Sequence, residues 1–256
     1  MLISDLHLNP SMPLTTERFQ AFCQSEALKA QAIFIMGDLF EFWVGDDAHL
    51  QSSYHQYIGQ ILHQLSSHGV KLYFMAGNRD FMLGEEFASL ANWVTIPDPS
   101  IVKIAGKNVL LAHGDSLCTD DWGYQLFRSF NRLEWLQKSF LQLPVSWRHK
   151  FGSHLRNNST IKYKKRQTLL LKQENQAADR KGDVTLAACD QMTTQYQCDL
   201  LIHGHTHRPG KHTESLNGHS WQRWVLSDWD LDQSIEQSRA NMIRINATGI
   251  AAIDLT

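Results

Sequence analysis

The chain has 256 residues and a mass of 29.4 kDa, the size of one large α/β domain or of one domain with an insertion. With 43% apolar and 20% charged residues and no low-complexity tract, its composition is that of a soluble globular protein. No apolar stretch approaches the roughly 18 residues that a bilayer span needs, and the acid at position 5 argues against a signal peptide. The scattered cysteines contain no CxxC pair, which favours reduced thiols in a cytosolic protein over disulfides or a zinc ribbon: Cys23, Cys118, Cys189 and Cys198.

The formal net charge is −2, but it is unevenly distributed along the chain. Residues 126–181 contain 13 Lys and Arg against three acids, whereas the rest of the chain contains 11 bases and 23 acids. An acidic body with a basic insert points to a functional asymmetry and says little about the fold.

The first half of the chain alternates short apolar runs with helical periodicity. Thr16 is a plausible cap for the first helix, and Gly69 stops the second. The elements predicted in chain order are a strand at 2–4, a helix at 15–30, a strand at 32–36, a helix at 49–68, a strand at 70–76 and a hairpin-like pair at 101–104 and 108–112.

A helix-rich segment interrupts the strands in the second half, so we predict a core of residues 1–120 and 195–256 with a helical cap insertion of residues 121–194. After the cap the chain returns to short strands, as β-branched and aromatic runs between turns indicate. These later strands are predicted at 200–202, 221–227, 242–245 and 250–255.

Polar residues suited to metal binding follow the predicted strands in five blocks. In open α/β sheets, ligands bind in the crevice outside the carboxyl ends of the strands. Taken singly, an Asp after a strand is usually a helix cap and a lone His is usually a satisfied core or surface residue. The shared placement at strand ends favours metal ligation by the set Asp5, His7, Asp38, Asn78, His113, His205 and His207.

This set combines oxygens with imidazoles and lacks thiolates, which suits Mn²⁺, Fe²⁺ or Zn²⁺ and argues against a structural zinc. Seven ligands are too many for one ion. With one bridging carboxylate they fit two ions about 3.5–4 Å apart, and a hydroxide between such ions is a nucleophile for phosphoryl displacement at neutral pH.

The blocks Asp5-x-His7, Gly37-Asp38, Gly77-Asn78, His113 and Gly204-His205-x-His207 resemble those of the calcineurin-like metallophosphoesterases. The resemblance implies an α/β fold, a β-sandwich flanked by helices (αββα) with two metals at its edge. It assigns Asp38 as the bridging ligand and implies direct catalytic roles for Asp38, Arg79 and His113. One ion would be held by Asp5, His7, Asp38 and His207, and the other by Asp38, Asn78, His113 and His205.

Arg79 departs from the superfamily pattern, in which a histidine usually follows Gly-Asn and protonates an alkoxide leaving group. Expelling a phosphate monoester, whose second pKa is about 6, needs no such acid. An arginine can instead bind phosphate oxygens bidentately. Arg79 therefore favours cleavage of a pyrophosphate link; the plainer alternative is that it pairs with Asp80.

The Gly-Asn-Arg-Asp form, with Gly-Asp-Leu-Phe-Glu-Phe-Trp-Val-Gly-Asp-Asp and Ile-His-Gly-His-Thr-His-Arg-Pro, is similar to the UDP-2,3-diacylglucosamine pyrophosphatases of lipid A biosynthesis. That resemblance implies hydrolysis to UMP and 2,3-diacylglucosamine 1-phosphate, typically with two Mn²⁺ ions. It also implies a cytoplasmic protein peripherally associated with the inner membrane. The substrate contacts it implies are Asn78, Arg79, Asp121, Lys181 and His205.

The predicted cap suits a lipid substrate, because residues 122–141 form an aromatic-rich helical face and residues 162–166 are basic. Apolar surface can hold two acyl chains, and bases attract diphosphate and anionic headgroups. Alternatively, the aromatic residues form the interior of the cap and the bases a solvated face.

Two other functions stay open at this point. A hydrolase of another pyrophosphate or phosphodiester, such as a dinucleoside polyphosphate or a nucleic acid, would share the metal site, although no nucleic acid is expected here. A non-catalytic scaffold is disfavoured because such members have generally lost ligands, and none of the seven is missing.

Overall fold

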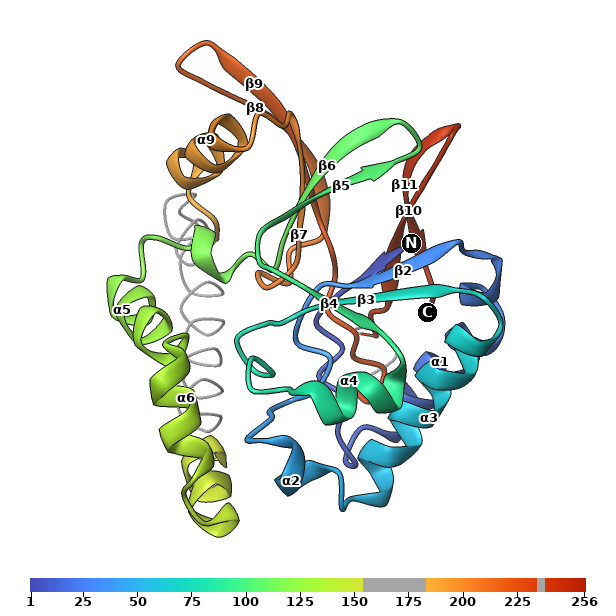
Figure 1. The fold of residues 1–256 in the computed structure, drawn as a ribbon. Coiled ribbons are helices and arrows are strands. Elements are labelled where there is room, and N and C mark those ends of the chain that lie inside the picture. Colours follow the sequence, from blue (N-terminus) through green and yellow to red (C-terminus); the bar gives the residue numbers. More distant parts are fainter. Residues whose placement is uncertain (154–182, 234–237) are drawn as a thin grey trace.

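The computed structural model describes residues 1–153, 183–233 and 238–256. Two β-sheets pack face to face between layers of helices, with a helical arm standing beside them (Figure 1). Among the described residues, no helix is long and apolar enough to cross a membrane.

The first sheet has the order β11-β10-β1-β2-β3-β4, in which β1 to β4 run parallel and β10 and β11 are antiparallel. Its strands are β1 (Leu2–Ile3), β2 (Ala32–Ile35), β3 (Lys71–Met75), β4 (Val94–Ile96), β10 (Asn241–Asn246) and β11 (Gly249–Asp254). The covering helices are α1 (Pro13–Gln24), the short 3-10 turn Ala27–Lys29, α2 (Asp46–His49), α3 (Ser53–Ser67) and α4 (Glu85–Ala91).

The second sheet has the order β5-β6-β7-β9-β8, with β6, β7 and β9 parallel and the two edge strands antiparallel. Its strands are β5 (Ser100–Ile104), β6 (Lys107–Ala112), β7 (Leu200–His203), β8 (Gly210–Leu216) and β9 (His219–Val225). The helix α9 (Leu186–Gln195) covers its outer face.

Both faces of the central strands are apolar because each sheet is covered on both sides. On β6, Val109 and Leu111 pack between the sheets while Leu110 and Ala112 face α9. The alternation follows from the period of two in a strand. The predicted αββα architecture is confirmed.

The remaining helices, α5 (Trp122–Asn131), α6 (Glu134–Leu141) and a helical stretch over 145–153, form the arm. A turn at Asp115–Leu117 leads into it. The division at residues 121 and 194 stays a prediction; α9, which that division places in the cap, packs against the second sheet.

Several element boundaries differ from the sequence prediction. The helix predicted at 49–68 begins later, at Ser53 of α3, because residues 50–52 form a turn and His49 is the last residue of the short helix α2. The His49 side chain accepts a hydrogen bond from the Val44 N–H (3.2 Å). Thr16 is not the cap of α1: Asp232, more than 200 residues away, accepts from the N–H groups of Leu14 and Thr15. The strands β4 and β8 and the helix α4 were not predicted from the sequence.

Candidate metal centre and adjoining cavity

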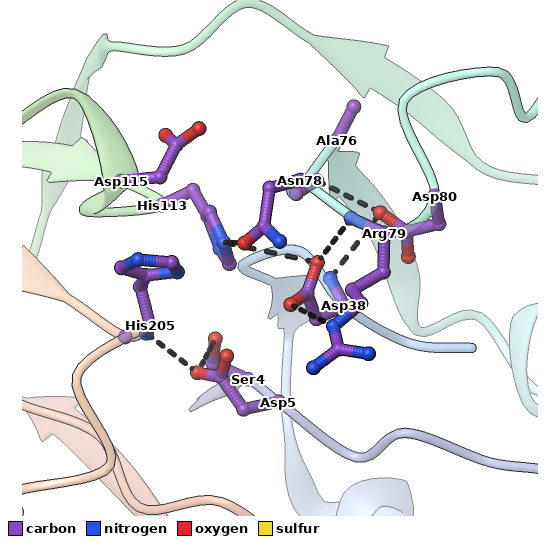
Figure 2. A network of polar contacts seen from close by, with 12 residues as sticks. Ser4, Asp5, Asp38, Ala76, Asn78, Arg79, Asp80, His113, Asp115 and His205 are labelled. Carbon is purple, nitrogen blue, oxygen red and sulfur yellow. Dashed lines mark hydrogen bonds and ion pairs between the residues drawn. The ribbon is translucent and has the colours of Figure 1, made fainter. Parts of the chain in front are cut away.

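The carboxyl ends of the parallel strands of both sheets meet at one edge of the sandwich, and the candidate site residues lie just beyond them (Figures 1 and 2). This convergence of β1, β2, β3, β6 and β7 is what parallel pairing within each sheet requires. The residues brought to this edge are Asp5, His7, Asp38, Asn78, Arg79, His113, His205 and His207.

Most of the predicted ligands have left-handed backbone conformations, which is unusual for residues other than glycine. Such a conformation costs on the order of 1–2 kcal/mol for a residue with a Cβ, and such strain gathers at functional sites. The sequence carries no signal for this feature. The ligands with positive φ are Asp5 (55°), His7 (49°), Asp38 (54°), His205 (67°) and His207 (54°).

Glycines precede several of these ligands because the chain segments approach too closely for a Cβ. At Gly204 an added Cβ would lie 2.1 Å from Ser4 Oγ and 2.3 Å from Asp5 Oδ2. Packing, and not an unusual backbone conformation, therefore requires glycine at position 204, since its φ is not among the positive values. Position 37 needs glycine for two reasons. The φ of Gly37 is 90°, and an added Cβ would lie only 2.5 Å from His113 Nδ1.

One cluster consists of Asp5, His7 and His207, whose potential ligand atoms all lie within 4.8 Å of one another. His207 Nε2 lies 3.4 Å from Asp5 Oδ1 and 3.3 Å from His7 Nε2. Burial would raise the pKa of Asp5, but His207 beside it holds that pKa well below its usual value. Asp5 is therefore a carboxylate.

The second cluster consists of Asp38, His113 and His205, again with ligand atoms within 4.8 Å of one another. His113 Nε2 lies 3.1 Å from Asn78 Oδ1 and 3.8 Å from Asp38 Oδ1. Burial raises the pKa of Asp38 to about 7. The charges of Asp80 and Asp5 also raise this pKa, and the charge of His113 opposes the shift. The pKa of His113 rises to about 9, because the charges of Asp38, Asp5 and Asp115 outweigh its burial.

The donor chemistry of both clusters fits divalent cations. Asp5 Oδ1 is buried without a hydrogen-bond partner, and the Nε2 atoms of His7 and His207 face each other. Unpartnered buried polar atoms are costly, and a cation accepting their lone pairs would satisfy them. Two oxygen and imidazole clusters at one edge therefore match the two-ion prediction; Asp38 as a bridge stays a prediction.

Three of the four imidazoles face an oxygen atom with their other nitrogen, as ligating histidines usually do. His113 Nδ1 lies 2.9 Å from the Met36 carbonyl, so Nδ1 donates there, while Nε2 faces Asn78 Oδ1 at 3.1 Å. His7 Nδ1 lies 3.6 Å from Glu41 Oε2, and His207 Nδ1 lies 3.4 Å from Asp228 Oδ2. Sequence reasoning assigned no role to Glu41, although it lies in the quoted Gly-Asp-Leu-Phe-Glu run, and it missed Asp228, which follows no recognised ligand block.

Arg79 does not pair with Asp80, which was the plainer alternative. Its Nη1 donates to Glu41 Oε1 at 2.9 Å, and its backbone N–H donates to Asp38 Oδ1 at 2.9 Å. Asp80 is fully buried and accepts from the N–H groups of Leu39 and Gly77 (2.7 and 2.8 Å), so it joins the loops that follow β2 and β3 (Figure 2).

A cavity of about 950 Å³ opens between this edge and the arm. Asn78, Arg79 and Asp121 line it, and Asp121 also caps α5 by accepting from the Tyr124 N–H (3.0 Å). Lys181 lies outside the described residues, as does the basic run at 162–166. The apolar part of the lining includes Phe81, Met82, Phe127, Leu136, Phe140 and Phe151.

Ion pairs at both of its ends hold the arm beside the site. Arg128 on α5 donates to the buried carboxylates of Asp115 (2.8 Å) and Asp98 (3.1 Å), and Tyr124 also donates to Asp115 (2.8 Å). At the far end of the arm, the buried Arg148 donates to the Val44 carbonyl and pairs with the carboxylate of Asp47. The cavity walls are thus fixed by charge pairs at both ends.

The model of the calcineurin-like phosphoesterase family matches residues 1–209. Fold, site and match together define a metal-dependent phosphoesterase. Three curated relatives are named UDP-2,3-diacylglucosamine hydrolase. That of Ralstonia nicotianae is 38% identical, covering 99% of this chain and 91% of its own; that of Aeromonas hydrophila is 41% identical, covering 90% of each; and that of Xanthomonas axonopodis pv. citri is 39% identical, covering 97% and 96%. The chain belongs to the calcineurin-like phosphoesterase family and, within it, to the UDP-2,3-diacylglucosamine hydrolases.

Among solved structures, Vacuolar Protein Sorting 29 from Cryptosporidium parvum is similar at a TM-score of 0.44 and 12% identity, with 99% of this chain and 83% of that chain covered.

Proposed function

We propose that this enzyme hydrolyses the pyrophosphate bond of UDP-2,3-diacylglucosamine, giving UMP and 2,3-diacylglucosamine 1-phosphate. The observation that carries the proposal is the continuity between the two ligand clusters and an apolar cavity, with Asn78 and Arg79 lining the cavity beside the clusters. The diphosphate of this substrate would lie at the ligand clusters, and its two acyl chains would lie in the adjoining apolar cavity.

Two divalent ions, which we propose to be Mn²⁺, would be held by the seven predicted ligands. Asp5, His7 and His207 would hold one ion, and Asp38, Asn78, His113 and His205 the other, with Asp38 shared between them. When bound, such ions polarise phosphoryl oxygens and provide a nucleophile at neutral pH.

The protein's own residues would bind and orient the diphosphate. The Arg79 side chain is 23% exposed and lines the cavity, and its guanidinium is suited to bidentate contact with phosphate oxygens. Because the leaving phosphate needs no proton, Arg79 can replace the histidine acid of other members. Asp121 at the N-terminus of α5 and Lys181 are proposed as further substrate contacts.

The cavity volume supports a lipid over a dinucleoside polyphosphate. About 950 Å³ is at the upper end of small-molecule sites, and much of its lining is aromatic or aliphatic. A polyphosphate or nucleic acid would leave this surface in water. The arm also presents exposed indoles, Trp122, Trp135 and Trp147, which suit the interface of a bilayer. We therefore propose peripheral association with the cytoplasmic face of the inner membrane.

The test is to incubate the purified protein with Mn²⁺ and UDP-2,3-diacylglucosamine in detergent micelles and to measure UMP release. We expect activity for the wild type, loss of at least three orders of magnitude for Asp38→Ala and His113→Ala, and an unchanged far-UV circular dichroism spectrum. The exposed His63→Ala variant is the control. Wild-type rates from the two ligand variants in metal-depleted buffer would refute the site.

The same assay separates the alternative. A nucleic-acid enzyme would lose affinity steeply with salt and would ignore detergent. We expect the opposite: weak dependence on salt between 50 and 200 mM and a requirement for micelles or vesicles that present the substrate. Faster hydrolysis of an oligonucleotide than of the UDP lipid would overturn the proposed substrate.

A further inference from the structure

The segment Ser227–Asp230, which follows β9, touches the candidate metal centre from outside the residues that the family model matches. Its Trp229 N–H donates to the Asp5 carbonyl at 3.0 Å, and its Asp228 carboxylate lies 3.4 Å from His207 Nδ1. Two members of one ligand cluster are thus supported by the same short segment.

Asp228 is itself held firmly. It is 5% exposed, and Arg239 donates to both of its oxygens, from Nε to Oδ1 at 2.9 Å and from Nη2 to Oδ2 at 2.6 Å. The backbones of Asp230 and Arg239 also exchange hydrogen bonds (2.8 and 2.9 Å). A bidentate arginine pair of this kind fixes the plane of the carboxylate.

We propose that Asp228, clamped by Arg239, is a positioning residue that holds His207 in the tautomer and orientation for metal binding. A carboxylate facing Nδ1 keeps the proton on that atom, so the Nε2 lone pair is directed toward Asp5 and His7. This inference rests on the proposed metal site. It predicts that removing Asp228 lowers the affinity for one ion. The affinity of the second cluster should not change, because its His113 is oriented by the Met36 carbonyl.

The experiment is a Mn²⁺ titration of the metal-free protein, followed by the electron paramagnetic resonance signal of free Mn²⁺, with no substrate present. The wild type should bind two ions. Asp228→Ala should weaken one site 10- to 100-fold and leave the other unchanged, on the usual scale for partners behind a ligand. Asp228→Asn should lose less, because its amide oxygen still accepts from Nδ1, and Arg239→Met should fall between the wild type and Asp228→Ala.

Asp232→Ala is the matched control, because it removes the same charge from the same region. Asp232 contacts the N-terminus of α1 and makes no contact with a ligand histidine. Equal Mn²⁺ isotherms for Asp228→Ala, Asp228→Asn and Asp232→Ala would overturn the inference, whereas a wild type that binds no Mn²⁺ would overturn the proposed metal site instead. The isosteric Asp228→Asn keeps the test decisive should Asp228→Ala fail to fold.

Discussion

Arg79 is held by Glu41, a residue that sequence reasoning did not select, and Glu41 also faces Nδ1 of the ligand His7. One carboxylate therefore links the proposed phosphate-binding group to a proposed metal ligand. The guanidinium is ordered at the cavity before any substrate arrives, which reduces the side-chain entropy lost on binding.

We expect Arg79→Ala to lower kcat/KM for the UDP lipid about 10- to 150-fold, the 1.5–3 kcal/mol expected of a hydrogen bond to a charged group. Arg79→Lys should recover only part of this, since a lysine cannot bind bidentately. The comparison is hydrolysis of a nitrophenyl phosphodiester, which also needs no acid but makes fewer contacts. Equal losses on both substrates would contradict a phosphate-binding role.

Gly204 shows how little room the ligand loops leave. We expect Gly204→Ala to destabilise the fold by about 1–3 kcal/mol and to weaken Mn²⁺ binding, because the new methyl group would displace Asp5. Gly218→Ala is the control, since Gly218 has a φ of 83° but open space around it. It should cost about 1 kcal/mol by backbone strain alone and leave Mn²⁺ binding unchanged. Urea unfolding and a Mn²⁺ titration measure the two effects; equal Mn²⁺ affinity for Gly204→Ala and wild type would contradict the steric account.

At the scale of elements, the arm is attached to the sheets by buried charge pairs, and apolar residues line the space between them. Arg128 and Arg132 on or just after α5 face Asp98 and Asp115, two carboxylates that are almost wholly buried. A buried pair adds little net stability, but breaking one leaves an uncompensated charge. The arm is therefore held in one place, and the cavity beside the metal centre keeps its shape.

Arg128→Met should destabilise the protein by on the order of 3 kcal/mol, because Asp115 loses its 2.8 Å charge partner and keeps only the neutral Tyr124 hydroxyl at that distance, with Arg132 at 3.7 Å. We also expect faster cleavage of the arm in limited proteolysis. Lys138→Ala is the control: its pair with Glu134 on α6 is exposed, and such pairs contribute less than about 1 kcal/mol. Urea midpoints measure both, and similar shifts for the two variants would show that the buried pairs do not hold the arm.

At the scale of the whole molecule, His49 and His55 make stability depend on pH away from the metal centre. His49 stacks on Trp43 at 4.4 Å, and burial lowers its pKa to about 3; burial also lowers the pKa of His55 to about 4. In the unfolded chain both titrate near 6.5, so below that pH the unfolded state takes up protons that the folded state does not. The stability that these two neutral histidines contribute to the folded state is therefore fully present above pH 6.5 and is lost as the pH falls below it.

We therefore expect the unfolding free energy to fall between pH 6.5 and pH 4 with a slope approaching about 1.4 kcal/mol per pH unit for each histidine. Urea unfolding in the presence of a chelator excludes the metal contribution. His49→Gln should be less stable at neutral pH but flatter with pH, whereas the exposed His63→Gln should follow the wild type. A wild-type profile that is level over this range would contradict the assignment.

The αββα architecture, and the convergence of the seven predicted ligands at one edge of the sandwich, were predictable from the sequence. Each ligand block directly follows an apolar run of strand length, and parallel strands place their carboxyl ends at one edge whatever the loops between them do. What only the tertiary structure decided includes a contact between residues distant in the chain, the replacement of a Thr16 cap by Asp232. The structure also located the turn between α2 and α3 and the strands β4 and β8. The same holds for Glu41 and Asp228 behind the imidazoles and for the cavity beneath the arm. Local patterns specify which side chains can bind a metal, but which carboxylate stands behind each of them depends on packing that no local pattern contains.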